Sequence, residues 1–185
     1  MNSVLVAGIG NIFHGDDGFG VAVAGLMAEA PLPTGVDVVD FGIRGLDLAF
    51  ALTGGYRLAL LIDTVQRGEA PGTLYLIEPE PADPVEEAIS PHQIEPTDVL
   101  RLTRILGGPC AQVLLIGCEP ASFGPPDEGR IGLSGEVALA VPGAAEMALA
   151  AIADWMRQNP PEAGGLQPSL PSSHTTHETL QEETS

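Results

Sequence analysis

The chain has 185 residues and a formal net charge of −18 at pH 7, and 44% of its residues are hydrophobic. This length fits one domain with enough residues to bury a proper core. Nucleic-acid phosphates and anionic membrane surfaces would repel so acidic a chain, so we expect neither as a partner. A protein partner is compatible with this charge.

Cys110 and Cys118 are the only cysteines in the sequence. Cys118 lies in an apolar run and Cys110 precedes one, a pattern typical of buried, reduced thiols rather than of a disulfide framework. The N-terminus has no basic segment before its apolar stretch, and no apolar run approaches the roughly 20 residues that span a bilayer. We therefore expect a cytoplasmic protein, and a monomer.

Apolar segments alternate with segments of helical potential along most of the chain. The expected strands are residues 3–8, 36–41, 57–64, 72–78 and 111–118. The expected helices are residues 19–29, 45–52, 97–106 and 142–157, the last with Pro142 at its first position. This order predicts an α/β three-layer sandwich, with a twisted, largely parallel five-stranded sheet and helices on both faces. Because the link before residues 72–78 is short, that strand is expected to pair antiparallel.

The composition changes near the C-terminus. Residues 159–185 are rich in Pro, Gly, Ser, Thr and Glu and nearly lack large apolar side chains. Such a segment cannot bury enough surface to offset its ordering entropy, so it is expected to be a disordered tail behind a domain of residues 1–158. His174 and His177 lie in this tail and are not expected to bind a metal.

The first expected strand ends in a glycine-rich turn that carries two adjacent carboxylates, Asp16 and Asp17. Ligands bind at the carboxyl ends of parallel strands, so this turn predicts a cationic ligand rather than a phosphate. A dinucleotide fingerprint is excluded by Phe13 at its third glycine position, and a P-loop by the lack of a lysine. The alternative interpretation is that both acids only cap the helix that follows.

Two further acids, Asp40 and Asp63, end expected strands and should meet at the same edge as Asp17. Asp63 follows a continuous apolar run, so its carboxylate must reach solvent, a hydrogen-bond donor or a metal. His92 lies in a loop stiffened by the preceding proline. Two carboxylates and one imidazole form an incomplete ligand set that would hold a free divalent ion only loosely.

Nucleophilic hydrolases are the weaker interpretation of these residues. The sequence contains no Gly-x-Ser-x-Gly elbow. Ser90 and His92 are close in sequence but lack an evident orienting partner. Cys118 ends a strand without an obvious base beside it, so we assign it to packing.

In five motifs the chain resembles the NiFe-hydrogenase maturation endopeptidases, in the order and spacing of that family. The motifs are Gly8-x-Gly10-Asn11, Gly15-Asp16-Asp17-Gly18-x-Gly20, Asp40-x-Gly42-x-x-Gly45, Asp63 and Ser90-Pro91-His92-Gln93. The resemblance covers about residues 1–157. It implies a sheet between helices, and an aspartyl-type endopeptidase that removes a carboxyl-terminal extension from the hydrogenase large-subunit precursor after nickel insertion.

The resemblance also implies the chemistry of the site. Asp17, Asp63 and His92 fall on the family's metal-contacting positions and are the expected catalytic residues. Nickel would be contributed by the precursor and bound only weakly by the free enzyme. It would either polarise the scissile carbonyl or a water, or serve as a recognition tether while an acid activates water. Phe41 departs from the family's Asp-Gly-Gly turn, which bears on precursor recognition.

Two other functional classes use the same acidic edge. One is a non-catalytic metal-binding or metallochaperone module. The other is a spore-type germination peptidase, which shares this general architecture and would not require a nickel-loaded substrate.

Overall fold

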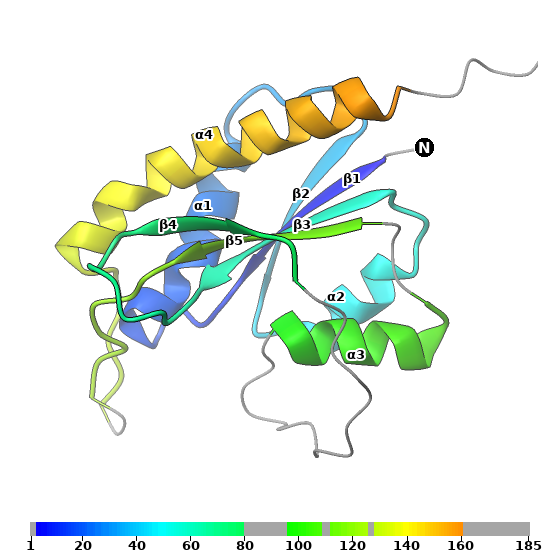
Figure 1. Cartoon of the computed structure of the whole chain (residues 1–185). Coiled ribbons are helices and arrows are strands. Elements are labelled where there is room, and N and C mark those ends of the chain that lie inside the picture. The colour runs from blue at the N-terminus through cyan, green and yellow to red at the C-terminus, as the bar shows by residue number, and fades with distance from the viewer. Residues whose placement is uncertain (1–2, 80–95, 109–111, 126–127, 161–185) are drawn as a thin grey trace, which may run out of the picture.

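The computed structural model describes residues 3–79, 96–108, 112–125 and 128–160. These residues form a five-stranded sheet in the order β2-β1-β3-β5-β4 (Figure 1). The strands are β1 (Val4–Ile9), β2 (Val36–Gly42), β3 (Leu58–Thr64), β4 (Leu74–Ile77) and β5 (Gln112–Cys118). Strands β1, β2, β3 and β5 run parallel, whereas β4 pairs antiparallel with β5, as the short link predicted.

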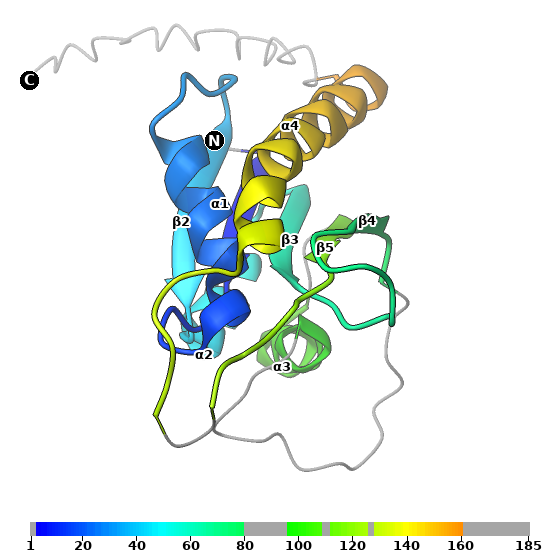
Figure 2. The same cartoon turned by 90° about the vertical axis from the view of Figure 1, so that its left-hand side faces the viewer.

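Helices cover both faces of the sheet, which confirms the predicted three-layer sandwich (Figures 1 and 2). The helices α1 (Phe19–Ala28) and α4 (Gly135–Gln158) lie on one face, and α2 (Gly45–Leu52) and α3 (Pro96–Leu106) lie on the other. A short 3-10 helix, η1 (Gly15–Gly18), joins β1 to α1.

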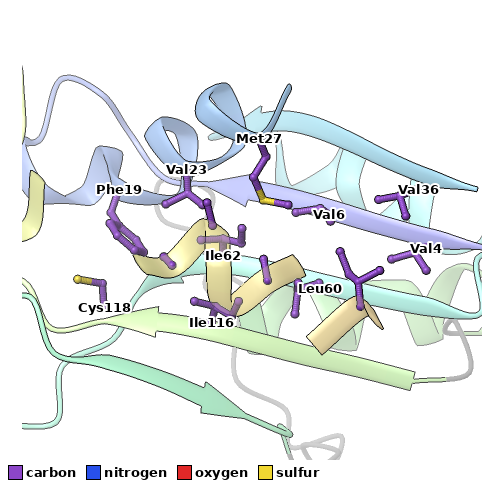
Figure 3. Close-up of a cluster of buried hydrophobic side chains, with 14 of the residues drawn as sticks. Val4, Val6, Phe19, Val23, Met27, Val36, Leu60, Ile62, Ile116 and Cys118 are labelled. Atoms are coloured by element: carbon purple, nitrogen blue, oxygen red, sulfur yellow. The ribbon is translucent and has the colours of Figure 1, made fainter. Parts of the chain in front are cut away.

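The alternation of side chains along the strands builds a separate core on each face. On the α1/α4 face, Val4 and Val6 pack with residues of the neighbouring strands and of α1 (Figure 3). On the opposite face, Leu5 and Ala7 pack against α2 and α3. Because β1 and β3 are buried on both faces, their sequences read as nearly continuous apolar runs.

The last helix begins earlier than its sequence predicted. Pro142 was expected at the first position, but α4 starts at Gly135 and Pro142 lies inside it. A proline in a helix interior removes one hydrogen bond and is normally destabilising. The first two turns persist because Val137 is fully buried in the core and the backbone of Ser134 is bonded to a buried carboxylate.

Its full length makes α4 the one helix of the described residues that could cross a membrane by length and composition. Within this fold, its inner face packs against α1, β5 and β4 and joins the core through Ala144, Ala148 and Ile152. Core helices of soluble proteins commonly pass the same test. Of the tail predicted for residues 159–185, the part from position 161 onward lies outside the described residues. Cys110 also lies outside them.

Candidate active site at the carboxyl edge of the sheet

The acids that end β2 and β3 lie at the same edge of the sheet, as predicted. In the strand register, Gly8 of β1 is level with Asp40 on one side and with Ile62 on the other. Asp63 therefore lies one residue further along the same edge. The sheet positions both acids through β1, which separates their two strands.

Strand alternation sends these two acids to opposite faces of the sheet. Asp63 continues the series of Ala59 and Leu61, which face α2 and α3. Asp40 continues the series of Val36 and Val38, which face α1 and α4. Asp63 is 7% exposed, and its Oδ1 accepts a hydrogen bond of 2.7 Å from the backbone N–H of Thr64, whereas Asp40 is exposed.

Asp17 lies in η1, which contacts β3, so its turn and the end of the Asp63 strand are neighbours. Its Oδ2 accepts a hydrogen bond of 2.9 Å from the backbone N–H of Asn11. Partial burial nevertheless raises the pKa of the Asp17 carboxyl, since it outweighs the opposing effects of Asn11 and of nearby His14. A cation placed beside Asp17 would stabilise its ionised form, which burial disfavours.

Two glycines explain how the turn comes so close to the strand ends. A side chain at Gly10 would meet the backbone oxygen of Asp17 at 1.7 Å, and Gly10 has a φ of +127°. A side chain at Gly20 would meet the carbonyl oxygens of Ile62 and Ile9 at 2.1 and 2.4 Å. The glycine motif therefore sets the approach of η1 and α1 to the sheet.

Asp16 has a different role from Asp17, and neither carboxylate caps α1. The Asp16 side chain is fully buried and joins η1 to the chain between β5 and α4. Its oxygens accept hydrogen bonds from the backbone N–H groups of Ala121, Ser122 and Ser134, at 2.8, 2.8 and 2.6 Å, and from the Ser134 hydroxyl at 3.0 Å. Burial penalises its charge, but these bonds outweigh the penalty and lower its pKa.

Glu119, which the sequence analysis did not single out, is a third buried carboxylate, after Asp16 and Asp63. It follows β5 as Asp63 ends β3, and this shared position was the available signal. Its oxygens accept hydrogen bonds from the backbone N–H groups of Arg67 and Gly68 and from the Tyr75 hydroxyl, at 2.8–3.1 Å. Burial opposes its charge, yet these bonds lower its pKa, and they fasten the link that follows Asp63.

Cys118 is fully buried in the core beneath the edge, as its assignment to packing predicted (Figure 3). Burial and the negative charges of Asp16 and Glu119 raise the pKa of its thiol to about 11. The thiolate that a nucleophile requires is therefore scarce at neutral pH.

His92 lies in the segment 80–95, outside the described residues, so the geometry of the predicted three-residue set is established only for Asp17 and Asp63. Within the described ranges, no group of three or more His, Cys, Asp and Glu side chains could hold a metal ion. Asp17 and Asp63 are oxygen donors of the type that suits a borderline divalent ion when other ligands complete its shell.

Known proteins share both the sequence and the fold of this chain. Residues 21–151 match the hydrogenase maturation protease family. The hydrogenase 2 maturation protease of Escherichia coli is 31% identical, over 80% of this chain and 90% of its own length.

The chain belongs to the hydrogenase maturation protease family. The family and the α/β fold predicted from the sequence are thereby confirmed. The solved structure of the hydrogenase maturating endopeptidase HybD from E. coli has a TM-score of 0.67 and 30% identity, covering 82% of this chain and 93% of its own. The hydrogenase 2 maturation peptidase of a Thaumarchaeota archaeon has a TM-score of 0.62 and 30% identity, covering 81% and 97%.

Other relatives of the family match over a smaller part of their length. The hydrogenase expression/formation protein HupD of Rhodobacter capsulatus is 37% identical, over 65% of this chain and 58% of its own length. The HoxM protein of Cupriavidus necator is 38% identical, over 63% and 59%. The matched region of this family member thus spans a little under three fifths of these two relatives.

The turn at the end of β2, next to Phe41, is built around Gly42. Phe41 packs into the core on the α2/α3 face, and Gly42 adopts the positive φ of +52° that the turn requires. The Arg44 guanidinium folds back over this turn: its Nε donates to the Phe41 carbonyl at 3.1 Å, and a second nitrogen donates to the Asp40 carbonyl. The Phe41 side chain is thus buried in the core while Gly42 makes the turn.

Proposed function

We propose that this protein is the endopeptidase that removes the C-terminal extension of a NiFe-hydrogenase large-subunit precursor after nickel insertion. Asp17, Asp63 and His92 contact the nickel that the precursor carries, and this contact brings the scissile bond to the enzyme. Family membership supports the reaction class. The observation that carries the residue assignment is the meeting of the Asp17 turn and the end of the Asp63 strand at one edge of the sheet.

The surrounding structure favours a preorganised pair of carboxylates. Glycines hold the Asp17 turn against β1 and β3, and Glu119 fastens the link that follows Asp63. The helix α3 begins at Pro96, four residues after His92 in the chain, and covers the face toward which Asp63 projects. A third ligand supplied from this direction would complete the protein's share of the nickel shell.

Two chemical roles fit this arrangement. In the first, nickel polarises the scissile carbonyl or a water, and the enzyme's ligands only position it. In the second, nickel is a recognition tether, and one of the carboxylates accepts the proton of the attacking water. In both roles, Asp17 and Asp63 must be ionised, and the tether converts the attack into a step within one complex.

Incubation of the purified protein with nickel-loaded large-subunit precursor tests the proposal. Mass spectrometry should show loss of a C-terminal peptide, and nickel-free precursor should remain uncut. Asp17→Asn, Asp63→Asn and His92→Ala should each lower the rate by about a hundredfold or more, because the substitution removes a ligand charge or nitrogen. Circular dichroism verifies that each variant is folded.

Two control variants separate ligand loss from general damage. Asp47→Asn removes an exposed carboxylate on α2 whose contact is with Arg44 at 3.9 Å, and Cys118→Ala removes the buried thiol. Both should process the precursor at close to the native rate. If the Asp63 and His92 variants process the precursor at the native rate and the Cys118 variant is inactive, the proposed metal contact is wrong and a cysteine nucleophile takes its place.

We further propose that the free enzyme binds nickel weakly and acts as a monomer in the cytoplasm. Two carboxylates and one imidazole leave several positions of the nickel shell to the substrate's own ligands. Calorimetry with nickel alone should therefore show weak binding that a chelator reverses. Stoichiometric nickel that survives chelation would instead indicate a resident metal.

A further inference from the structure

Large apolar side chains are exposed on three loops that leave the sheet at the acidic edge. Ile12 and Phe13 follow β1, Ile43 follows β2, and Phe123 and Ile131 lie between β5 and α4. We refer to these five residues as the apolar rim. Since β1, β2 and β5 are parallel, all three loops leave the sheet at its carboxyl edge, where Asp17 and Asp63 also lie.

Hydrogen bonds join the rim loops to one another. The Arg130 N–H donates to the Phe13 carbonyl at 2.8 Å, and the Gly15 N–H donates to the Arg130 carbonyl at 2.7 Å. The Gly10 N–H donates to the Gly42 carbonyl at 3.1 Å, which links the loop after β1 to the loop after β2. The rim is therefore a connected frame rather than a set of independent loops.

Hydrogen bonds to the buried Asp16 carboxylate hold one of the rim loops in place. Its carboxylate accepts the N–H groups of Ala121 and Ser122, directly before Phe123, and that of Ser134, three residues after Ile131. Both ends of the loop between β5 and α4 are thus fastened to η1, beside the loop that carries Phe13 (Figure 2). Apolar side chains on a preorganised frame lose little conformational entropy when a partner covers them.

We propose that the apolar rim is the docking surface for the folded body of the precursor, around the point where its nickel is contacted. This inference rests on the proposed function and names the surface that recognises the substrate. Contiguous apolar surface at a binding edge is typical of a site that a partner covers, and hydrogen bonds bring the rim loops together at this edge. The rim loops leave the sheet at the same edge as the acids, so a folded partner that brings its metal to the acids would approach the rim.

Charge argues against other occupants of this surface. Asp17 and Asp40 lie at the same edge of the sheet as the rim loops, so anionic lipid headgroups would be repelled there. A second copy of this chain would bring two acidic edges together, and each copy carries a formal charge of −18. A protein that carries a bound divalent metal complements both the apolar rim and the acids within it.

Matched substitutions can test the rim because similar side chains are exposed elsewhere on the molecule. Phe13 is 58% exposed, and Phe50 near the end of α2 is 54% exposed. Ile131 is 79% exposed, and Ile105 near the end of α3 is 71% exposed. Phe50 and Ile105 lie on segments that lead to the starts of β3 and β5, at the opposite edge of the sheet.

The experiment measures binding and processing for Phe13→Ser and Ile131→Ser, with Phe50→Ser and Ile105→Ser as controls. Each rim variant should raise the Kd for immobilised nickel-free precursor, and the KM for nickel-loaded precursor, about tenfold, because it removes a central apolar contact. The kcat should stay within about twofold, since the acids are unchanged. Ile131→Leu should restore binding.

Equal Kd and KM values for rim and control variants, with normal cleavage, would overturn the docking proposal and leave the proposed function intact. Weakened precursor binding by the rim variants, with no cleavage by the wild type, would support docking and refute the proposed function. Two other results would assign the rim to another partner. One is a wild-type dimer that the rim variants lose, and the other is wild-type binding to phosphatidylcholine vesicles that the rim variants lose, in each case with an unchanged KM for the precursor.

Discussion

Asp16 and Asp17 are adjacent in sequence and serve opposite purposes. Asp16 is fully buried and surrounded by donors, so its charge is stabilised in the folded chain. Asp17 is half-buried and accepts a hydrogen bond from the N–H of Asn11, and burial raises its pKa, so its charge is disfavoured. The first residue fastens η1 to the segment between β5 and α4, and the second is a carboxylate that we propose to contact the substrate's nickel.

Substitution by asparagine should separate these two roles. Asp16→Asn places an amide N–H₂ among three backbone donors and should lower the free energy of unfolding by about 2–4 kcal/mol. Asp17→Asn keeps an acceptor for Asn11 and removes a disfavoured charge, so stability should change by less than about 0.5 kcal/mol. Urea denaturation of both variants at pH 7 measures the difference. An equally large loss for Asp17→Asn would show that its carboxylate is structural.

At the residue scale, the strand pattern predicted that Asp17 and Asp63 lie at one edge of the sheet, but it did not predict the bonds that Asp16 and Glu119 make to distant segments. The prediction was possible because a carboxylate that follows an apolar strand must reach solvent, a hydrogen-bond donor or a metal, and so lies at the edge of the sheet. The partners of Asp16 lie 105–118 residues away in the chain, and those of Glu119 lie 44–52 residues away. No local pattern reveals which distant N–H groups will meet a carboxylate.

At the scale of elements, the packing of α1 on the sheet decides where Asp17 lies. Gly8 and Gly20 face each other across this contact: a side chain at Gly8 would meet the Gly20 carbonyl at 2.4 Å. The glycine spacing predicted a tight turn. Its larger effect is to let a whole helix lie unusually close to β1 and β3.

A pair of glycine substitutions within α1 tests this packing. Gly20→Ala would put a methyl group 2.1 Å from the Ile62 carbonyl oxygen, so helix and sheet must separate. It should lower the free energy of unfolding by about 2–3 kcal/mol or more. Gly25→Ala, in the same helix with nothing within 4 Å, should raise it by about 0.5–1 kcal/mol.

Thermal unfolding of both variants measures the contrast, with precursor processing as a second readout. Gly20→Ala should also slow processing, because η1 and Asp17 move with the start of α1. Similar melting temperatures for the two variants would mean that α1 can shift without strain, and that its glycines do not set the site.

Element boundaries show what sequence patterns can and cannot predict. Residues 45–52 were predicted with the observed bounds, and the start of α1 at Phe19 was also correct. The start of α4 was wrong by seven residues because Pro142 resembles an initiator. Burial of Val137 and the bonds from Ser134 to Asp16, both tertiary contacts, extend the helix backward past the proline.

For the whole molecule, buried carboxylates fasten the loops on both sides of the acidic edge. Asp16 holds the loop between β5 and α4, and Glu119 holds the link between β3 and β4. The folded chain therefore depends on two ionised groups whose pKa values lie below their ordinary values of 3.8 and 4.5. This dependence gives the protein a predictable response to acid.

The sign of that response follows from proton linkage. A group with a lowered folded-state pKa contributes its full stability above the ordinary value, and loses it as the pH falls through the folded-state pKa. The Glu119 contribution should therefore be constant above about pH 5 and decline below 4.5. That of Asp16 should decline only below 3.8.

Urea midpoints of the wild type, Asp16→Asn and Glu119→Gln between pH 7 and pH 3 isolate these contributions, because all other acids are common to the three proteins. Each variant should unfold at lower urea than the wild type at pH 7. The difference in urea midpoint between wild type and variant should narrow as the pH falls, first for Glu119→Gln and then for Asp16→Asn, because the wild-type carboxylates become protonated and no longer stabilise the fold as anions.

Differences in midpoint that stay constant down to pH 3, or widen, would show that the bonds do not depend on the charge of these carboxylates. The loops around the acidic edge would then be held by packing, and acid would affect processing only through the residues that we propose to contact nickel.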